Sequence, residues 1–134
     1  MRQLKERLEK AALHERTFQA DTYEIAEELE SEGAELDAVR TILKFMESHP
    51  DLDFGAPGPL CSFAETFAGR GYEVELVESL RRRPTPHTVT MLGGVIGGAE
   101  PGPTRESYLA ELRAAARHPQ ADDNLRAVVE FFLA

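Results

Sequence analysis

Apolar side chains recur along residues 1–32 at steps of three, four and their multiples, the spacing that lines one face of an α-helix. We expect one amphipathic helix here, or two. Asp21 followed by Glu24 has the spacing of a capping box, which would place a break near Ala20. Gly33 is expected to end the segment, because glycine readily adopts the left-handed conformation that closes a helix. The apolar positions are Leu4, Leu8, Ala11, Phe18, Ile25 and Leu29.

The same periodicity predicts further helices after Gly33. Pro59 and Pro86 suit the first turn of a helix, where a missing N–H costs nothing. Residues 49–58 and 97–102, rich in proline and glycine, are expected to be loops. The predicted helices cover residues 36–48, a stretch from Pro59, residues 72–83 with Val74, Val77 and Leu80 inward, a stretch from Pro86, residues 104–117, and a stretch opened by Asp122 or Asp123.

The fold class follows from this pattern. No β-branched or aromatic run alternates with period two over five residues, so no strand is expected and the class is all-α. From Pro59 onward short helices alternate with tight turns, which favours antiparallel helical hairpins stacked as a short HEAT-like bundle or solenoid of about six to eight helices. A length of 134 residues predicts a single domain over residues 1–134.

Charge and composition limit the classes of function that this chain can have. The chain has 24 acidic and 15 basic residues, a formal net charge of -9, and its longest basic run is Arg81 to Arg83. Nucleic-acid binding is therefore not expected, because it needs a basic surface that displaces counterions from phosphates. The single cysteine, Cys61, cannot form an internal disulfide, which is typical of a cytoplasmic protein. Residues 1–7 are charged and no apolar run reaches 18 residues, so neither a signal peptide nor a membrane span is expected.

The strongest local feature is an acidic run over residues 21–39, which contains eight carboxylates and no basic residue. On a helix, Ile25 and Leu29 share the inner face. Tyr23, Glu27 and Glu30 then point outward, with Glu24 and Glu28 beside them. Two interpretations stay open at this point: a solvated face that keeps the protein soluble, and a docking surface for a basic protein that relieves the repulsion between like charges.

Other motifs give little indication of chemistry. Asp51 and Asp53 lie near His49, but no third ligand stands at a recognisable spacing, and Asp beside Pro and Gly is ordinary in turns. Cys61, with His49, His87 or His118 as a base, could be a nucleophile, yet its apolar neighbours are more typical of a buried small side chain. We therefore expect no catalytic residue, no cofactor and no metal.

Residues 93–98 are rich in glycine without forming a nucleotide-binding loop. No strand precedes them, and their spacing is not G-x-G-x-x-G. Gly93 with Gly97, and Gly94 with Gly98, are instead pairs of small residues four positions apart. Such pairs predict either a close helix crossing or a frayed helix end.

Several segments resemble one family. They are residues 53–60 (Asp-Phe-Gly-Ala-Pro-Gly-Pro-Leu) and 83–89 (Arg-Pro-Thr-Pro-His-Thr-Val), with Gly-Tyr-Glu at 71–73 and, more weakly, residues 21–29. Together they resemble small all-helical bacterial proteins that give immunity to polymorphic toxins, including antidotes of contact-dependent growth-inhibition systems. The resemblance covers about two-thirds of the chain. Its motifs are turn and cap signatures, and at Gly93 and Gly94 this chain has glycine where larger helix formers are expected.

The resemblance implies stoichiometric binding of a cognate toxin domain in the cytoplasm of the producing cell, without catalysis. It carries no agreed toxin-contact residues onto this chain. Combined with the charge pattern, it gives our leading hypothesis of an immunity protein that occludes a basic toxin domain, such as a nuclease. The alternative is a HEAT-like interaction scaffold unrelated to toxins, and the oligomeric state stays open. The expected partner-binding residues are Tyr23, Glu24, Glu27, Glu28, Glu30, Asp51 and Asp53.

Overall fold

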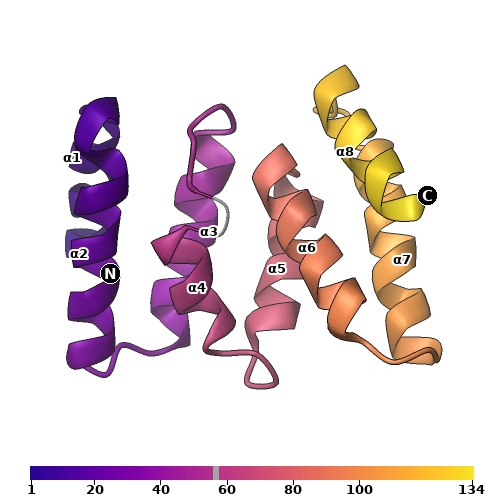
Figure 1. Ribbon diagram of the computed structural model, residues 1–134, viewed down its shortest axis with the longest axis horizontal. Helices are drawn as coiled ribbons and strands as arrows, with labels where there is room; N and C mark the ends of the chain where they lie inside the picture. The colour runs from indigo at the N-terminus through magenta and orange to yellow at the C-terminus, as the bar shows by residue number, and fades with distance from the viewer. Residues whose placement is uncertain (56–57) are drawn as a thin grey trace. The chain divides into compact units, whose positions relative to one another are not determined.

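The computed structural model describes residues 1–55 and 58–134, and over these residues it contains helices and no strand, which confirms the all-α class (Figure 1). Ala56 and Pro57, within the predicted 49–58 loop, lie outside the described residues. The elements are α1 (Arg2–Ala12), the 3₁₀ helix η1 (Glu15–Thr17), α2 (Phe18–Ser31), α3 (Leu36–Ser48), α4 (Pro59–Glu65), α5 (Tyr72–Arg82), α6 (Pro86–Gly98), α7 (Pro103–Ala116) and α8 (Asp123–Leu133).

The chain divides into two compact units, residues 1–75 and residues 76–134, and α5 begins in the first and ends in the second. In the first unit, hairpin α1–α2 packs on hairpin α3–α4, with α1 against α3 and α2 against α4. This is the two-layer stacking of helical repeats. The prediction of one domain over residues 1–134 stays a prediction.

An aromatic cluster anchors the loop after α3 in the first unit. Phe54 is 2% exposed, and its ring meets those of Phe18 and Phe45 edge-on at centroid distances of 5.7 and 5.9 Å. The loop therefore contributes to the core, because each aromatic ring buries a large apolar area. The cluster also places the beginning of α2 at Phe18.

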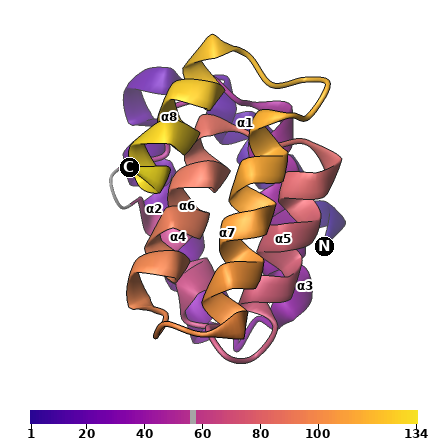
Figure 2. The ribbon, with the colours of Figure 1, turned by 90° about the vertical axis from the view of Figure 1, so that its right-hand side faces the viewer.

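In the second unit α6 packs against both α7 and α8, which also contact each other (Figure 2). Arg81 at the end of α5 forms an ion pair with Glu111 of α7, with 2.6 Å between Nη2 and Oε1. The core is aliphatic and consists of residues such as Leu76, Leu80, Val89, Leu92, Ile96, Leu112, Leu125 and Val129.

The structure corrects the predicted break in the first segment. Two helices form, but they separate at residues 13–17, and α2 begins at Phe18 rather than near Ala20. Asp21 is not a cap: its carboxylate accepts a hydrogen bond from Thr17 Oγ1 at 3.0 Å, inside the first turn of α2. The predicted capping box is therefore wrong, because burial of Phe18 in the aromatic cluster sets the helix start more strongly than local capping does.

Other helix ends agree with the sequence. Gly33 has a φ of 68° and closes α2, with Ala34 N–H donating to the Leu29 carbonyl at 2.9 Å. Thr85 caps α6 in a reciprocal box with Thr88, and Pro86 follows as the first helical residue. Asp122 caps α8 by accepting a hydrogen bond from Leu125 N–H at 2.8 Å.

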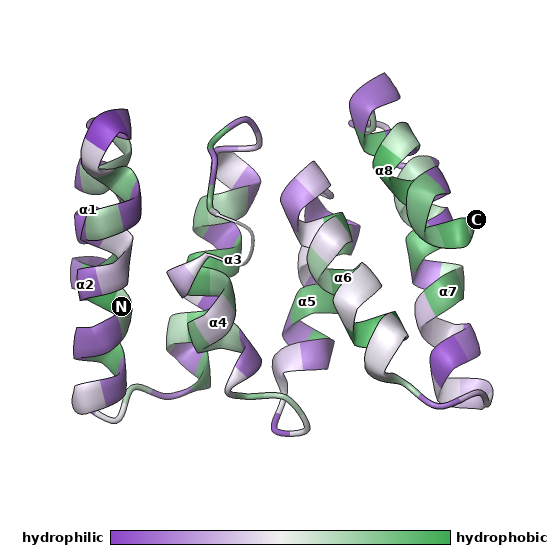
Figure 3. Ribbon diagram, viewed as in Figure 1, coloured by the Kyte–Doolittle hydropathy of each residue, from purple (hydrophilic) through white to green (hydrophobic). Residues whose placement is uncertain are grey.

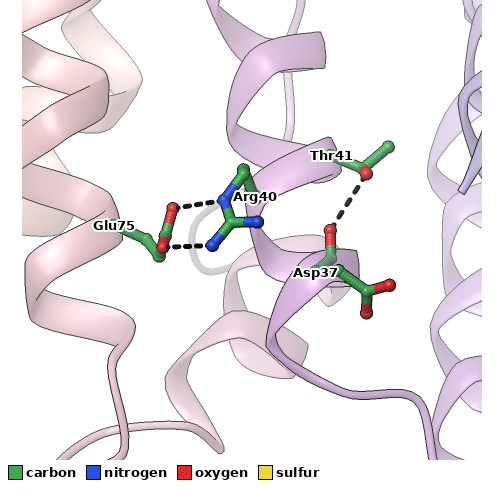
Figure 4. A network of polar contacts seen from close by, with 4 residues as sticks. All are labelled: Asp37, Arg40, Thr41 and Glu75. Carbon is green, nitrogen blue, oxygen red and sulfur yellow. Dashed lines mark hydrogen bonds and ion pairs between the residues drawn. The ribbon is translucent and has the colours of Figure 1, made fainter.

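The register of α5 differs from the prediction. Val74 is 61% exposed, whereas Glu75 is 5% exposed and faces inward with Tyr72 and Leu76. The inward Glu75 meets Arg40 of α3, whose Nε and Nη2 donate to its two oxygens at 3.0 and 2.8 Å (Figure 4). The expectation for Val74 is therefore wrong, because a bidentate ion pair makes a buried carboxylate tolerable at a position that hydropathy assigns to the surface.

The glycine-rich stretch is helical as far as Gly98, so the predicted turn begins two residues later than expected. Gly93 is buried against α8: a Cβ placed on it would lie 2.4 Å from the Phe132 ring. Gly94, Gly97 and Gly98 have no neighbouring atom within 4 Å of such a Cβ. A close helix crossing thus exists, but at one glycine rather than through the two predicted pairs.

A candidate protein-binding face

The outward face of α2 carries the side chains that sequence reasoning selected. Ile25 and Leu29 are 3% and 5% exposed and face the core. This confirms the predicted orientation of the helix, while the role of its outer face stays a prediction. The exposed residues are Tyr23, Glu24, Glu27, Glu28 and Glu30.

Tyr23 is an aromatic side chain set among carboxylates. It is 59% exposed. A hydrogen bond with Glu27, together with the charge of that carboxylate and, more weakly, of Glu30, raises the pKa of the Tyr23 hydroxyl. In this hydrogen bond the Tyr23 hydroxyl donates to the Glu27 carboxylate. The result is an amphipathic ring displayed beside a local negative charge, a combination that suits a cationic protein surface.

The acidic face is not uniform. Glu28 pairs with Arg7 of α1, with 2.5 Å between Oε2 and Nη1, and both side chains are about half exposed, at 48% and 44%. Sequence reasoning missed this pair, because 21 residues separate the partners and only the packing of α1 on α2 brings them together. Glu28 is thus partly neutralised, although an exposed pair contributes little stability.

A groove of about 270 Å³ lies between α1 and α2. Asp21 and Glu24 line it on the α2 side, and Arg7 and Lys10 line it on the α1 side. His14, just after the end of α1, also lines the groove. Cations close to these two carboxylates weaken the field that they project. The least compensated part of the face is therefore its C-terminal half, around Glu27 and Glu30.

Asp51 and Asp53 do not join this part of the face. The Asp53 carboxylate accepts a hydrogen bond from Gly55 N–H at 2.9 Å, an Asx-type turn, and its carbonyl accepts one from Gln19 Nε2 at 2.8 Å. Gln19 lies in the first turn of α2, and Glu30 follows it by about 16 Å along the helix axis. The grouping of Asp51 and Asp53 with Glu27 and Glu30 is therefore unsupported by the geometry.

The side chains that could have been catalytic or metal-binding residues make other contacts. His49 Nε2 lies 2.8 Å from a Glu9 oxygen, and among the described residues no cluster of three His, Cys, Asp or Glu side chains could hold a metal ion. Cys61 is buried and its thiol donates to Glu65 at 3.4 Å. Burial, reinforced by the Glu65 charge, raises the pKa of Cys61 to about 12, which disfavours a reactive thiolate at neutral pH.

The fold and this face define an all-α protein of stacked helical hairpins with an exposed acidic helix. Compared with protein-family models, with curated proteins and with solved structures, the chain matches none of them. Within residues 1–55 and 58–134, every helix is too short or too polar to span a lipid bilayer.

Proposed function

We propose that this chain is an immunity protein that binds a cognate toxin domain stoichiometrically in the cytoplasm and blocks it without catalysis. The toxin surface is basic, as in a nuclease whose cleft must attract phosphates. Support comes from two independent sources: the resemblance of the turn and cap segments to immunity proteins, and the charge distribution on α2. A scaffold unrelated to toxins remains the competing function.

The observation that carries the proposal is the concentration of charge. Residues 1–75 contain 17 of the 24 acidic and eight of the 15 basic residues, so this unit accounts for the whole net charge of -9. Helix α2 has five carboxylates and no basic residue. A field of this kind accelerates association with a basic protein and fixes the orientation of docking.

Within α2 the proposed contact centres on Tyr23, Glu27 and Glu30. Tyr23 supplies an aromatic anchor of the kind that dominates binding energy at protein interfaces. Glu24 and Glu28 lie beside the centre with part of their charge compensated by α1. Asp51 and Asp53 are left out of the proposed contact, because Asp53 is tied to the opposite end of α2.

The proposal predicts that a neighbouring gene encodes the toxin domain, and the test uses the domain found there. Co-expression should protect cells that make that domain. In stopped-flow association with an inactive form of the domain, Glu27→Lys with Glu30→Lys should slow binding about tenfold at low salt and flatten its dependence on ionic strength. The matched control is Glu78→Lys with Glu100→Lys, which changes the net charge equally but in residues 76–134.

Equal effects of the two double variants would contradict the proposed face, because the global charge alone would then govern association. Absence of both binding and protection would overturn the immunity function. Simultaneous binding of two other proteins, without protection, would favour the scaffold.

A further inference from the structure

Helix α8 is rich in hydrophobic residues (Figure 3). Phe131 is 73% exposed, and Leu133, two residues later, is 38% exposed. Val128 and Phe132 are only partly buried. A single exposed apolar residue is ordinary, but Val128 and Phe132 lie on the same side of α8 as Phe131, whereas Leu133 points away, so these three side chains form one apolar cluster.

The structure holds Phe131 in its exposed position. Phe132 packs over Gly93 of α6, where the missing Cβ makes room for its ring. The Phe131 ring meets the Phe132 ring edge-on, with centroids 5.1 Å apart and planes at 87°. Phe131 is thus oriented before any partner arrives, which lowers the entropy cost of using it in an interface.

Opposite charges flank this aromatic. Arg126 and Glu130 are four residues apart, on the same side of α8, and both are exposed. Glu130 has no ion-pair partner among the described residues, and Arg126 makes only local contacts, to the exposed Asp123 at 3.3 Å and to the Ala121 carbonyl at 3.2 Å. The guanidinium retains further N–H donors for a partner.

This arrangement is self-complementary. If two α8 helices pack antiparallel about a two-fold axis that passes near Val128, Arg126 of each copy faces Glu130 of the other. Each Phe131 then lies level with Leu125 of the opposite helix, between the exposed Asn124 and Ala127. Residues 76–134 contain seven acidic and seven basic side chains, so two copies that meet through this unit bring no net repulsion from it.

We propose that α8 is a self-association surface through which two copies of this chain form an antiparallel pair. Phe131 is its apolar anchor, and the reciprocal Arg126 and Glu130 contacts set its register. An 11-residue helix is about 16 Å long, so the interface is smaller than the standard size and the dissociation constant is expected in the micromolar range or above. The surface consists of residues of the second unit, whereas the acidic face of α2 consists of residues of the first.

Sedimentation velocity of the full chain, from about 1 μM to 1 mM, tests this. The wild type should pass from monomer to dimer with concentration. Phe131→Glu should weaken association at least tenfold, whereas Leu13→Glu, which changes another exposed apolar side chain at 79% exposure, should leave it unchanged. Circular dichroism confirms that each variant folds.

Charge reversal of Arg126 and Glu130 gives a more specific test of the proposed register. Arg126→Glu and Glu130→Arg should each weaken association, and the two together should restore it, because the reciprocal contacts are then re-formed with reversed sign. A wild type that stays monomeric up to 1 mM would overturn the proposal, and so would equal effects of Phe131→Glu and Leu13→Glu. Failure of the double reversal to restore association would overturn the antiparallel register. Glu27→Lys with Glu30→Lys should dimerise normally, which separates this result from the test of the immunity function.

Discussion

Residues 1–75 and residues 76–134 are built from the same kind of helical hairpin, yet their balance of acidic and basic side chains differs. The first unit has 17 acidic and eight basic side chains, and the second has seven of each. The interiors also differ: among the described residues the first unit buries the carboxylate of Glu75 beside the hydroxyl of Thr22, whereas the buried polar side chains of the second are the hydroxyls of Ser79, Thr85 and Thr88. Helix packing constrains only the inward positions, so one architecture can carry two unlike surfaces.

The difference also shows how the first unit tolerates its charge. The exposed pair of Arg7 and Glu28 contributes little, because water screens it. Breaking the pair of Arg40 and Glu75 would cost more, since the Glu75 carboxylate would then lie in the interior without its bidentate partner. On α2, Glu27 and Glu30 have no ion-pair partner among the described residues, whereas α1 places cations close to Glu24 and Glu28.

The largest expected effect concerns the buried thiol of the first unit. With a pKa raised from 9.0 to about 12, Cys61 should hold about a thousandfold less thiolate at pH 8 than an ordinary thiol. Alkylation of the folded protein by iodoacetamide should therefore be much slower at pH 8, and its rate should still rise with pH between pH 9 and pH 10, because the pKa lies above that range. The urea-unfolded chain is the control and should level off above pH 9. Ordinary thiol reactivity in the folded protein at pH 8 would contradict the burial of Cys61.

The next effect tests the interior charge. Arg40→Met leaves the Glu75 carboxylate buried without its bidentate partner and should lower the free energy of unfolding by about 2–3 kcal/mol in urea denaturation. Combining it with Glu75→Leu should recover at least half of the loss, because the buried charge is then removed. A loss for Arg40→Met below about 0.5 kcal/mol would show that solvent already screens the pair.

The smallest expected effect concerns the close contact between Gly93 and Phe132 in the second unit. It is tested by the same substitution, glycine to alanine, at two positions of α6. Gly93→Ala puts a methyl group against the Phe132 ring and should destabilise the protein by about 1 kcal/mol. Gly97→Ala, in the same helix but facing open space, should stabilise it by about 0.5–1 kcal/mol through helix propensity. Denaturation midpoints compare the two. A stabilising effect of Gly93→Ala would mean that the Phe132 ring moves aside at no cost.

Much of the fold could be predicted because its signals are local. The apolar spacing gives helix α3 at residues 36–48 without error, and Pro59, Thr85, Pro86 and Asp122 mark helix starts through their own backbone and capping chemistry. The outward orientation of Tyr23, Glu27 and Glu30 followed from helical geometry alone.

The errors lie where a distant contact outweighs the local signal. The start of α2 depends on the packing of Phe18 against Phe45 and Phe54, which overrides the capping box at Asp21. The inward side of α5 depends on Arg40, which lies 35 residues before Glu75. No short window of sequence contains such partners.

By itself, the sequence determined the all-α class, most helix boundaries and the excess of negative charge on one helix, because these depend on residues that are neighbours along the chain. Only the tertiary structure decided which carboxylates keep their charge uncompensated, that Asp53 belongs to the other end of α2, and that Gly93 seats Phe132 and so leaves Phe131 exposed. The physical reason is that ion pairing and close packing depend on separation in space, which the chain order does not contain.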